Sequence, residues 1–195
     1  MTHDRPSDLE PLTRIQILSV MGVTAVLLLG VAKAWQYWGQ VRLLAVELGW
    51  WPLWWGLVLA VAIVLSSGVV YQVWPAYRQS ADSYLELVIK PLLWWDLIWL
   101  GLLPGLSEEL LFRGVMLPAL GLDFSAVIFS SVVFGVLHLS NPSQWPYVVW
   151  ATVVGLALGY SALVSDNLLV PIVAHVLTNL VSSALWKWSR RGNDI

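Results

Sequence analysis

The sequence predicts an all-α, polytopic membrane protein, and three observations favour this fold class. The chain of 195 residues is 58% hydrophobic and only 11% charged, whereas a soluble globular domain is about one quarter charged. Several stretches without charge approach the roughly 20 residues that a helix needs to cross a bilayer. The strict alternation of apolar and polar residues that is typical of outer-membrane strands is absent from the sequence.

The expected membrane spans follow from these uncharged or nearly uncharged stretches. They lie at residues 15–32, 50–74, 124–139, 145–165 and 167–186, and a sixth apolar stretch, 91–120, carries four charges. Trp residues gather at the ends of the stretches, as at Trp50, Trp74 and Trp186, where indole rings find the membrane interface.

The number of spans depends on the stretch 91–120. If it crosses once as a broken helix the count is six, and if the chain reverses at Pro104-Gly105 the count is seven. Six is preferred, because both termini and the polar loop 75–91 then share the side that holds most Lys and Arg. By the positive-inside rule that side is cytoplasmic.

The composition also excludes several classes of function. The net charge is −2 at pH 7 and no basic block is present, so we expect no nucleic-acid partner. The chain has no cysteine, which rules out disulfides, thiolate metal sites and cysteine nucleophiles. Membrane lipid is the partner that the composition itself predicts.

Three charged side chains lie together inside the apolar stretch 91–120. Each of Glu108, Glu109 and Arg113 would cost about 2.5–3.5 kcal/mol at the centre of a bilayer, so their presence needs a reason. Glu109 and Arg113 are four residues apart, which is the spacing of an ion pair within one helix. Such a pair would neutralise one acid and leave Glu108 available for chemistry.

Two histidines lie in further apolar stretches. Phe134 and His138 share a helical face, and so do His175 and Asn179. Packed inward with Glu108, these side chains would form one polar site. A glutamate with two histidines is a workable set of zinc ligands, and a glutamate with a histidine is a workable general base for a water molecule. The combination favours a hydrolase.

Each group also has a purely structural explanation. Ser107 could cap a helix that begins after the Pro104-Gly105 break, with both acids in its first turn. His138 could stabilise a helix C-terminus, and His175 and Asn179 could form hydrogen bonds between membrane helices. A transporter with a buried ionisable relay would explain the charges as well, but not the three motifs.

Together the motifs resemble those of a known family. Glu-Glu-x-x-x-Arg, Phe-x-x-x-His and His-x-x-x-Asn follow one another on successive predicted helices. In this order they resemble the CPBP family of intramembrane proteins, which are also called CAAX proteases or Abi proteins. The Ras-converting CAAX endopeptidase of eukaryotes is similar. The resemblance covers residues 91–188.

The resemblance implies an intramembrane endopeptidase that hydrolyses a peptide bond near the membrane. The substrate would be a peptide or a membrane-proximal protein. By motif, Glu108 would activate the water, Glu109 would be its partner acid, Arg113 the organising cation, and His138 would assist the base. The alternative is a non-proteolytic relative that acts in bacteriocin self-immunity or as a scaffold.

The same resemblance gives roles to the last motif and to a metal. His175 and Asn179 would stabilise the oxyanion. The family is described both as metal-dependent and as metal-independent. If the protein depends on Zn²⁺, His138, His175 and Glu108 would be the ligands.

Four segments are expected along the chain. Residues 1–14 would form a cytoplasmic tail, 15–90 two transmembrane helices and a polar loop, 91–188 the CPBP-like catalytic core, and 189–195 a basic C-terminal tail. The expected location is the bacterial inner membrane, as a multi-pass protein with both termini cytoplasmic.

Overall fold

The structure, a computed structural model, describes residues 12–190. Within this range all regular structure is helical, so the predicted all-α class is confirmed. The predicted tails fall mostly on residues 1–11 and 191–195, which lie outside the described part of the chain.

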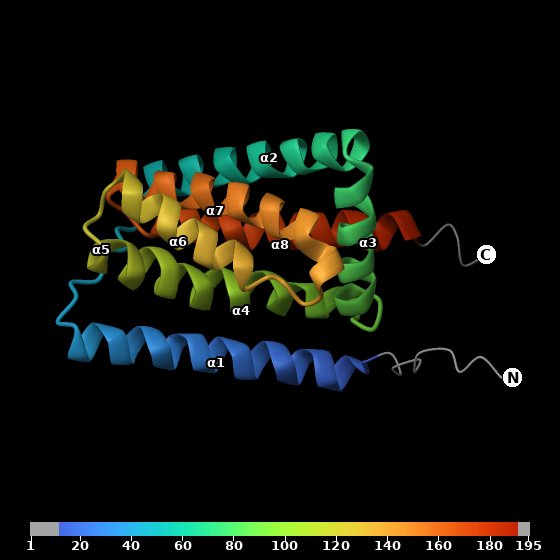
Figure 1. The fold of residues 1–195 in the computed structure, drawn as a ribbon, viewed down its shortest axis with the longest axis horizontal. Helices are drawn as coiled ribbons and strands as arrows, with labels where there is room; N and C mark the ends of the chain where they lie inside the picture. The colour runs from blue at the N-terminus through green and yellow to red at the C-terminus, as the bar shows by residue number, and fades with distance from the viewer. Residues whose placement is uncertain (1–11, 191–195) are drawn as a thin grey trace, which may run out of the picture.

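Most helices run roughly along one axis, and one helix lies across an end of the bundle (Figure 1). The helices along the common axis are α1 (Arg14–Trp38), α2 (Trp50–Val73), α4 (Leu97–Glu109), α6 (Phe124–Val136), α7 (Trp145–Ser165) and α8 (Leu169–Arg190). The π-helix η2 (Leu110–Met116) and the short α5 (Leu117–Ala119) continue α4. The crossing helix is α3 (Pro75–Ile89), and two short 3₁₀ turns are η1 (Trp94–Asp96) and η3 (Pro142–Gln144).

The predicted count of six spans is too high by the criterion of length and composition. Among the described residues, only α1, α2, α8 and the stretch Pro142–Ser165 are long and apolar enough to cross a membrane. A fifth span results if α3 and Trp94–Ala119, which are bent by 108° from one another, count as one. The difference has two causes, because α6 has only 13 residues and the stretch Trp94–Ala119 carries four charged side chains. The chain is nevertheless a multi-pass membrane protein with outward-facing apolar side chains along α1 and α2.

The prediction of a helix break at Pro104-Gly105 is wrong, because α4 continues through both residues. A proline removes a single N–H, and a membrane helix that packs against neighbours tolerates this loss. Ser107 does not cap a helix, since its hydroxyl donates to the Leu103 carbonyl (2.7 Å). Gly105 serves close packing instead: a Cβ at this position would lie 2.5 Å from Cγ2 of Val176 on α8.

The π-helix η2 directly follows the two glutamates. Such wide turns leave backbone groups without their usual partners and occur frequently at functional sites. Here the Gly114 carbonyl accepts a hydrogen bond from the Leu44 N–H (3.0 Å) in the loop between α1 and α2. The same loop is held at Glu47, whose N–H and carbonyl both bond to the Asn167 side chain (3.2 and 2.9 Å). The loop thereby joins η2 to the turn between α7 and α8.

The interpretation of residues 75–91 as a polar loop is also wrong, because most of them form α3. Pro75 occupies the first helical position, where its fixed φ favours a helix. The inward side holds Tyr77, Ala81 and Ile89, which are buried, while Glu86 is exposed on the opposite side. This spacing is that of an amphipathic helix, and the sequence contained the pattern.

The helix α6, which leads to His138, begins at a side-chain cap. The Asp123 carboxylate accepts hydrogen bonds from the Ser125 hydroxyl (2.7 Å) and the Ala126 N–H (2.8 Å). These bonds favour the charged form and hold the pKa of Asp123 below its ordinary value. The start of α6 is thereby fixed in register.

We expect Gly135→Ala to destabilise the protein by about 1–3 kcal/mol, the usual effect of overpacking. The added Cβ would lie 2.0 Å from Oγ1 of Thr152 and 2.9 Å from the Val148 carbonyl, at the contact of α6 with α7. Gly68→Ala is the matched control, because a Cβ there meets nothing within 4 Å. Thermal unfolding in detergent measures both, and equal midpoints for the two variants would contradict this packing.

Candidate active site

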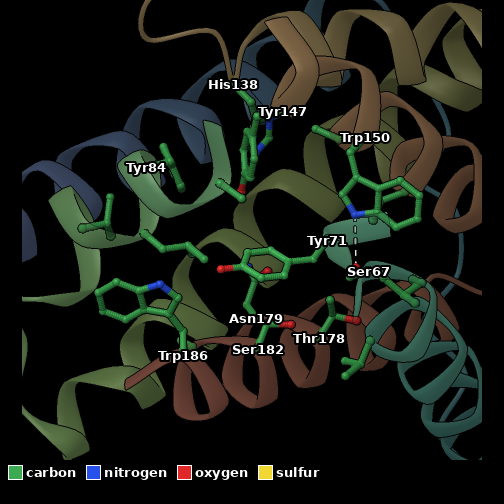
Figure 2. Close-up of a pocket in the computed structure, with 18 of the residues that line it drawn as sticks. Ser67, Tyr71, Tyr84, His138, Tyr147, Trp150, Thr178, Asn179, Ser182 and Trp186 are labelled. Carbon is green, nitrogen blue, oxygen red and sulfur yellow. Dashed lines mark hydrogen bonds between the residues drawn. The ribbon is translucent and has the colours of Figure 1, made fainter. Parts of the chain in front are cut away.

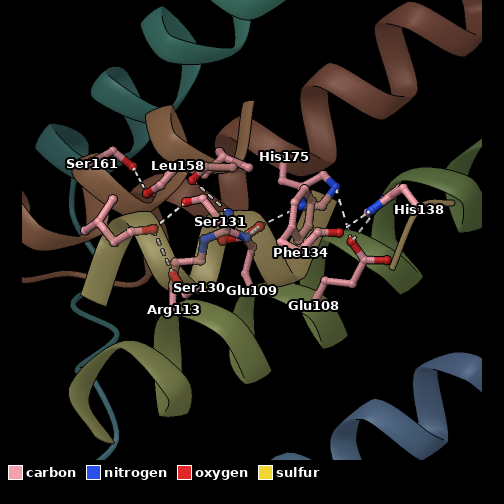
Figure 3. A network of polar contacts seen from close by, with 12 residues as sticks. Glu108, Glu109, Arg113, Ser130, Ser131, Phe134, His138, Leu158, Ser161 and His175 are labelled. Carbon is pink, nitrogen blue, oxygen red and sulfur yellow. Dashed lines mark hydrogen bonds and ion pairs between the residues drawn. The ribbon is translucent and has the colours of Figure 1, made fainter. Parts of the chain in front are cut away.

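The residues that the three motifs supply converge in the middle of the bundle. They are Glu108 and Glu109 at the end of α4, Arg113 in η2, His138 just beyond α6, and His175 and Asn179 on α8. The charged members of this group and the two imidazoles face one another (Figure 3). Four of the residues, Glu108, His138, His175 and Asn179, line one cavity.

Glu109 and Arg113 form a fully buried ion pair. The Arg113 guanidinium donates to Oε1 of Glu109 (2.8 Å), and both side chains are 0% exposed. Arg113 also donates to the Gly155 carbonyl (2.9 Å) and lies over the Phe134 ring at 4.6 Å. The contact expected from the four-residue spacing is therefore present, and it links η2 to α6 and α7.

Glu109 has a second partner that the sequence did not indicate. The Nδ1 atom of His175, on α8, lies 2.7 Å from the same Oε1 atom. A carboxylate only accepts hydrogen bonds, so Nδ1 carries the proton. Glu109 therefore fixes the orientation of the His175 ring.

The His138 ring is fixed in a similar way. Its Nδ1 atom lies 2.8 Å from the Phe134 carbonyl, which can only accept, so this nitrogen also carries a proton. The contact with a helix-end carbonyl is the structural role that the sequence left open for His138. Because it occupies Nδ1 alone, the ring keeps Nε2 for a second partner.

Both Nε2 atoms face Glu108. Oε2 of Glu108 lies 4.0 Å from Nε2 of His138 and 3.9 Å from Nε2 of His175. This oxygen is buried and has no hydrogen-bond partner among the described residues. Both distances exceed a direct hydrogen bond, and a water molecule can bridge separations of this size.

A cavity of about 570 Å³ extends from this group toward α3 and the end of α8. Its wall includes several aromatic side chains, namely Tyr71 from α2, Tyr84 from α3, Tyr147 and Trp150 from α7, and Trp186 from α8 (Figure 2). Sequence reasoning did not find these residues, and it placed Trp186 only as an interface anchor. No motif marks them, because they come from four separate elements.

The part of the chain that carries these residues is similar to known proteins. Residues 90–181 match the family model described as type II CAAX prenyl endopeptidase Rce1-like. This part of the chain is similar to the Rce1-like family. The matched range contains all six candidate residues, so the family resemblance inferred from the three motifs is confirmed.

The alignment with one relative is longer than the range that matches the family model. The uncharacterized protein YpbD of Bacillus subtilis (strain 168) is 28% identical over 129 residues. The aligned part spans 66% of this chain and 66% of YpbD, slightly less than two thirds of each. No solved structure shows a significant match.

A zinc ion in this site would need donor atoms of suitable type at suitable spacing. Two imidazole nitrogens and a carboxylate are suitable donor types. Within residues 12–190, however, no three His, Asp or Glu side chains are placed to hold an ion together. Tetrahedral zinc bonds of about 2.0–2.2 Å require ligand atoms about 3.4 Å apart, which is shorter than the 3.9 and 4.0 Å found around Glu108.

Proposed function

We propose that this protein is an intramembrane endopeptidase in which Glu108 activates a water molecule. The observation that carries the proposal is the position of Oε2 of Glu108, buried without a partner and 3.9–4.0 Å from two imidazole nitrogens. Similarity of residues 90–181 to the Rce1-like family supports the same reaction class. The substrate is a peptide or a membrane-proximal protein that reaches the cavity.

The reaction begins with the removal of a proton from water by Glu108, assisted by Nε2 of His138. The resulting hydroxide attacks the carbonyl carbon of the peptide bond, and the carbonyl oxygen becomes negative. Glu108 then returns the proton to the leaving amine as the C–N bond breaks, so that protons and electrons balance. This sequence uses one carboxylate first as base and then as acid.

The negative oxygen of the intermediate needs hydrogen-bond donors. In the proposal these are the side-chain amide of Asn179 and Nε2 of His175. His175 can donate from Nε2 only if both ring nitrogens carry a proton before the reaction begins, and the Glu109 carboxylate, 2.7 Å from Nδ1, stabilises that imidazolium. Preorganised donors of this kind act strongly in a buried site.

We infer that the end of the bundle carrying α3 faces the cytoplasm. The start of α1, α3 and the end of α8 lie together there (Figure 1). Most of the described Lys and Arg residues are found at this end: Arg14, Arg78, Lys90, Lys187 and Arg190. Cytoplasmic loops carry such an excess. Substrate would then enter the cavity from the cytoplasmic side.

Asn179→Ala is expected to lower peptide turnover by about 10²–10³, the effect of removing one oxyanion donor. The purified protein in detergent would be incubated with membrane-proximal peptides, and mass spectrometry would quantify the products. Val181→Ala is the control, because it changes a 38% exposed apolar side chain on the same helix. Unchanged turnover in Asn179→Ala would remove this residue from the oxyanion site.

Chelation tests the metal question separately. Since the residues present do not form a ligand set, we expect 1,10-phenanthroline to leave turnover unchanged. A loss of activity that zinc restores would contradict this expectation. It would assign His138, His175 and Glu108 as ligands, where a metal lowers the barrier by polarising both the water and the carbonyl.

A further inference from the structure

The helix α3 forms the outer wall of the cavity that leads to Glu108. Its inward residues Tyr77, Ala81, Tyr84 and Leu85 all line that cavity. The chain bends by 108° between this helix and the stretch that carries the glutamates, so α3 lies across the bundle (Figure 1). A substrate that enters from this end must pass α3.

One carboxylate on α3 joins it to two other helices. Asp82 accepts hydrogen bonds from the Tyr71 hydroxyl (2.9 and 3.1 Å to its two oxygens) on α2. It also accepts one from the Trp186 indole N–H (3.3 Å) on α8. Arg190, one turn further along α8, forms an ion pair with it at 3.0 Å. Asp82 therefore gathers bonds from both helices that flank α3.

Two of these donors also belong to the cavity. Tyr71 and Trp186 line its wall (Figure 2), so a substrate that contacts these rings acts on the groups that hold Asp82. Ring contacts also join α3 to α7. Tyr84 and Tyr77 stack on Tyr147 with ring centroids 4.8 and 6.4 Å apart. An entering apolar chain can take the place of such ring contacts.

The closed position of α3 leaves a polar group unsatisfied. The hydroxyl of Ser80, on the inward side of the helix, is buried without a hydrogen-bond partner among the described residues. A buried unpaired hydroxyl is destabilising. Outward movement of α3 would expose this group to water and remove that penalty, so the helix is packed in a way that favours movement.

We propose that α3 is a movable wall that controls access to the cavity, and that Asp82 is the positioning residue that holds it closed. The inference rests on the proposed function only in naming a peptide as the molecule admitted. When Tyr71 and Trp186 turn toward a substrate, Asp82 loses donors and α3 moves away from α2 and α8. Arg190, which is 43% exposed, contributes less, because exposed ion pairs are weak.

The test uses the absence of cysteine from the chain. Ser182→Cys places a single thiol on α8 inside the cavity, and Ser130→Cys places one at a buried position that the cavity does not reach. Labelling by a water-soluble maleimide, without any substrate, reports access to each site. Asp82→Ala is expected to accelerate labelling at position 182 about tenfold or more, because hydrogen bonds to a charged group commonly shift an equilibrium by that factor.

Two further variants complete the design. Glu86→Ala, one turn along α3, removes an exposed acid that bonds to Lys90 on the outer side of the helix, and labelling should not change. Asp82→Asn keeps an acceptor for Tyr71 but loses the charge, and it should give an intermediate rate. A merely structural role for Asp82 would not produce this graded response at one site alone.

Equal labelling of position 182 in the wild type and in Asp82→Ala would overturn the proposal. A matching rise at position 130 would also overturn it, since the whole bundle would then have loosened. Because no substrate is present, the outcome is independent of whether the protein cleaves peptides. In the peptidase assay we expect Asp82→Ala to change KM for large substrates more than kcat.

Discussion

Replacing Arg113 by methionine is expected to lower the free energy of unfolding by about 3–5 kcal/mol, the usual effect of removing one partner of a buried ion pair. The change leaves Glu109, which is 0% exposed, without its guanidinium partner. It also removes the hydrogen bond to Gly155 and the contact over the Phe134 ring. Thermal and denaturant unfolding in detergent measure the loss.

A second substitution separates charge from packing. In the double variant Glu109→Gln with Arg113→Met the buried charge is gone, so we expect less destabilisation than in Arg113→Met alone. The control is Glu86→Ala, whose ion pair is 53% exposed on the acid and 71% on Lys90, and it should have little effect. If Arg113→Met unfolds like the wild type, the pair does not stabilise the bundle.

Loss of this pair should also change the geometry of the candidate active site. Glu109 bonds to Arg113 and to His175 through one oxygen atom. Without the guanidinium, that carboxylate can turn away from the imidazole, and Nε2 of His175 would no longer face Glu108. Arg113→Met is thus expected to reduce turnover even where enough folded protein remains for an assay.

The parts of this site that could be predicted are those set by spacing along one helix. Glu109 and Arg113 are four residues apart, and this alone predicts their contact. The cost of leaving charged groups in lipid predicts that Glu108 turns inward. Neither argument predicts the hydrogen bond between Glu109 and His175. The two residues are 66 positions apart in the sequence, and only the packing of α4 on α8 brings them together.

Two features of the backbone were not predictable in the same way. Pro104 and Gly105 suggested a break, but the tight contact of Gly105 with Val176 shows that this glycine serves packing. The π-helix Leu110–Met116 has no signature in a single sequence, since its extra width depends on what packs around it. Within it, the Gly114 carbonyl accepts a hydrogen bond from the Leu44 N–H.

The wall of the cavity could not be predicted from the sequence for a different reason. The apolar spacing of Tyr77, Ala81 and Tyr84 follows a helix, yet the charged and polar residues between them favoured a loop. Without α3, the aromatic residues of α2, α7 and α8 could not be assigned to a common cavity. The residues of the candidate site could therefore be predicted from the sequence, whereas the wall of the cavity beside them could not.

Glu108→Gln is expected to reduce peptide turnover by about 10²–10⁴, the contribution of a general base. Glutamine keeps the shape of the side chain but cannot take a proton from water. Since Oε2 of Glu108 has no hydrogen-bond partner among the described residues, the substitution breaks no direct hydrogen bond of that atom. Thermal unfolding should therefore be unchanged, which distinguishes a lost base from a lost fold.

Hydrolysis of membrane-proximal peptides by the wild type and by Glu108→Gln, compared side by side in detergent, tests the central claim most directly. Mass spectrometry would identify the new carboxyl and amino ends. The account predicts cleavage by the wild type and at least a hundredfold lower turnover for the variant. Equal cleavage by both proteins, or none by the wild type, would contradict it, and absent cleavage would favour the non-proteolytic role in bacteriocin self-immunity or scaffolding.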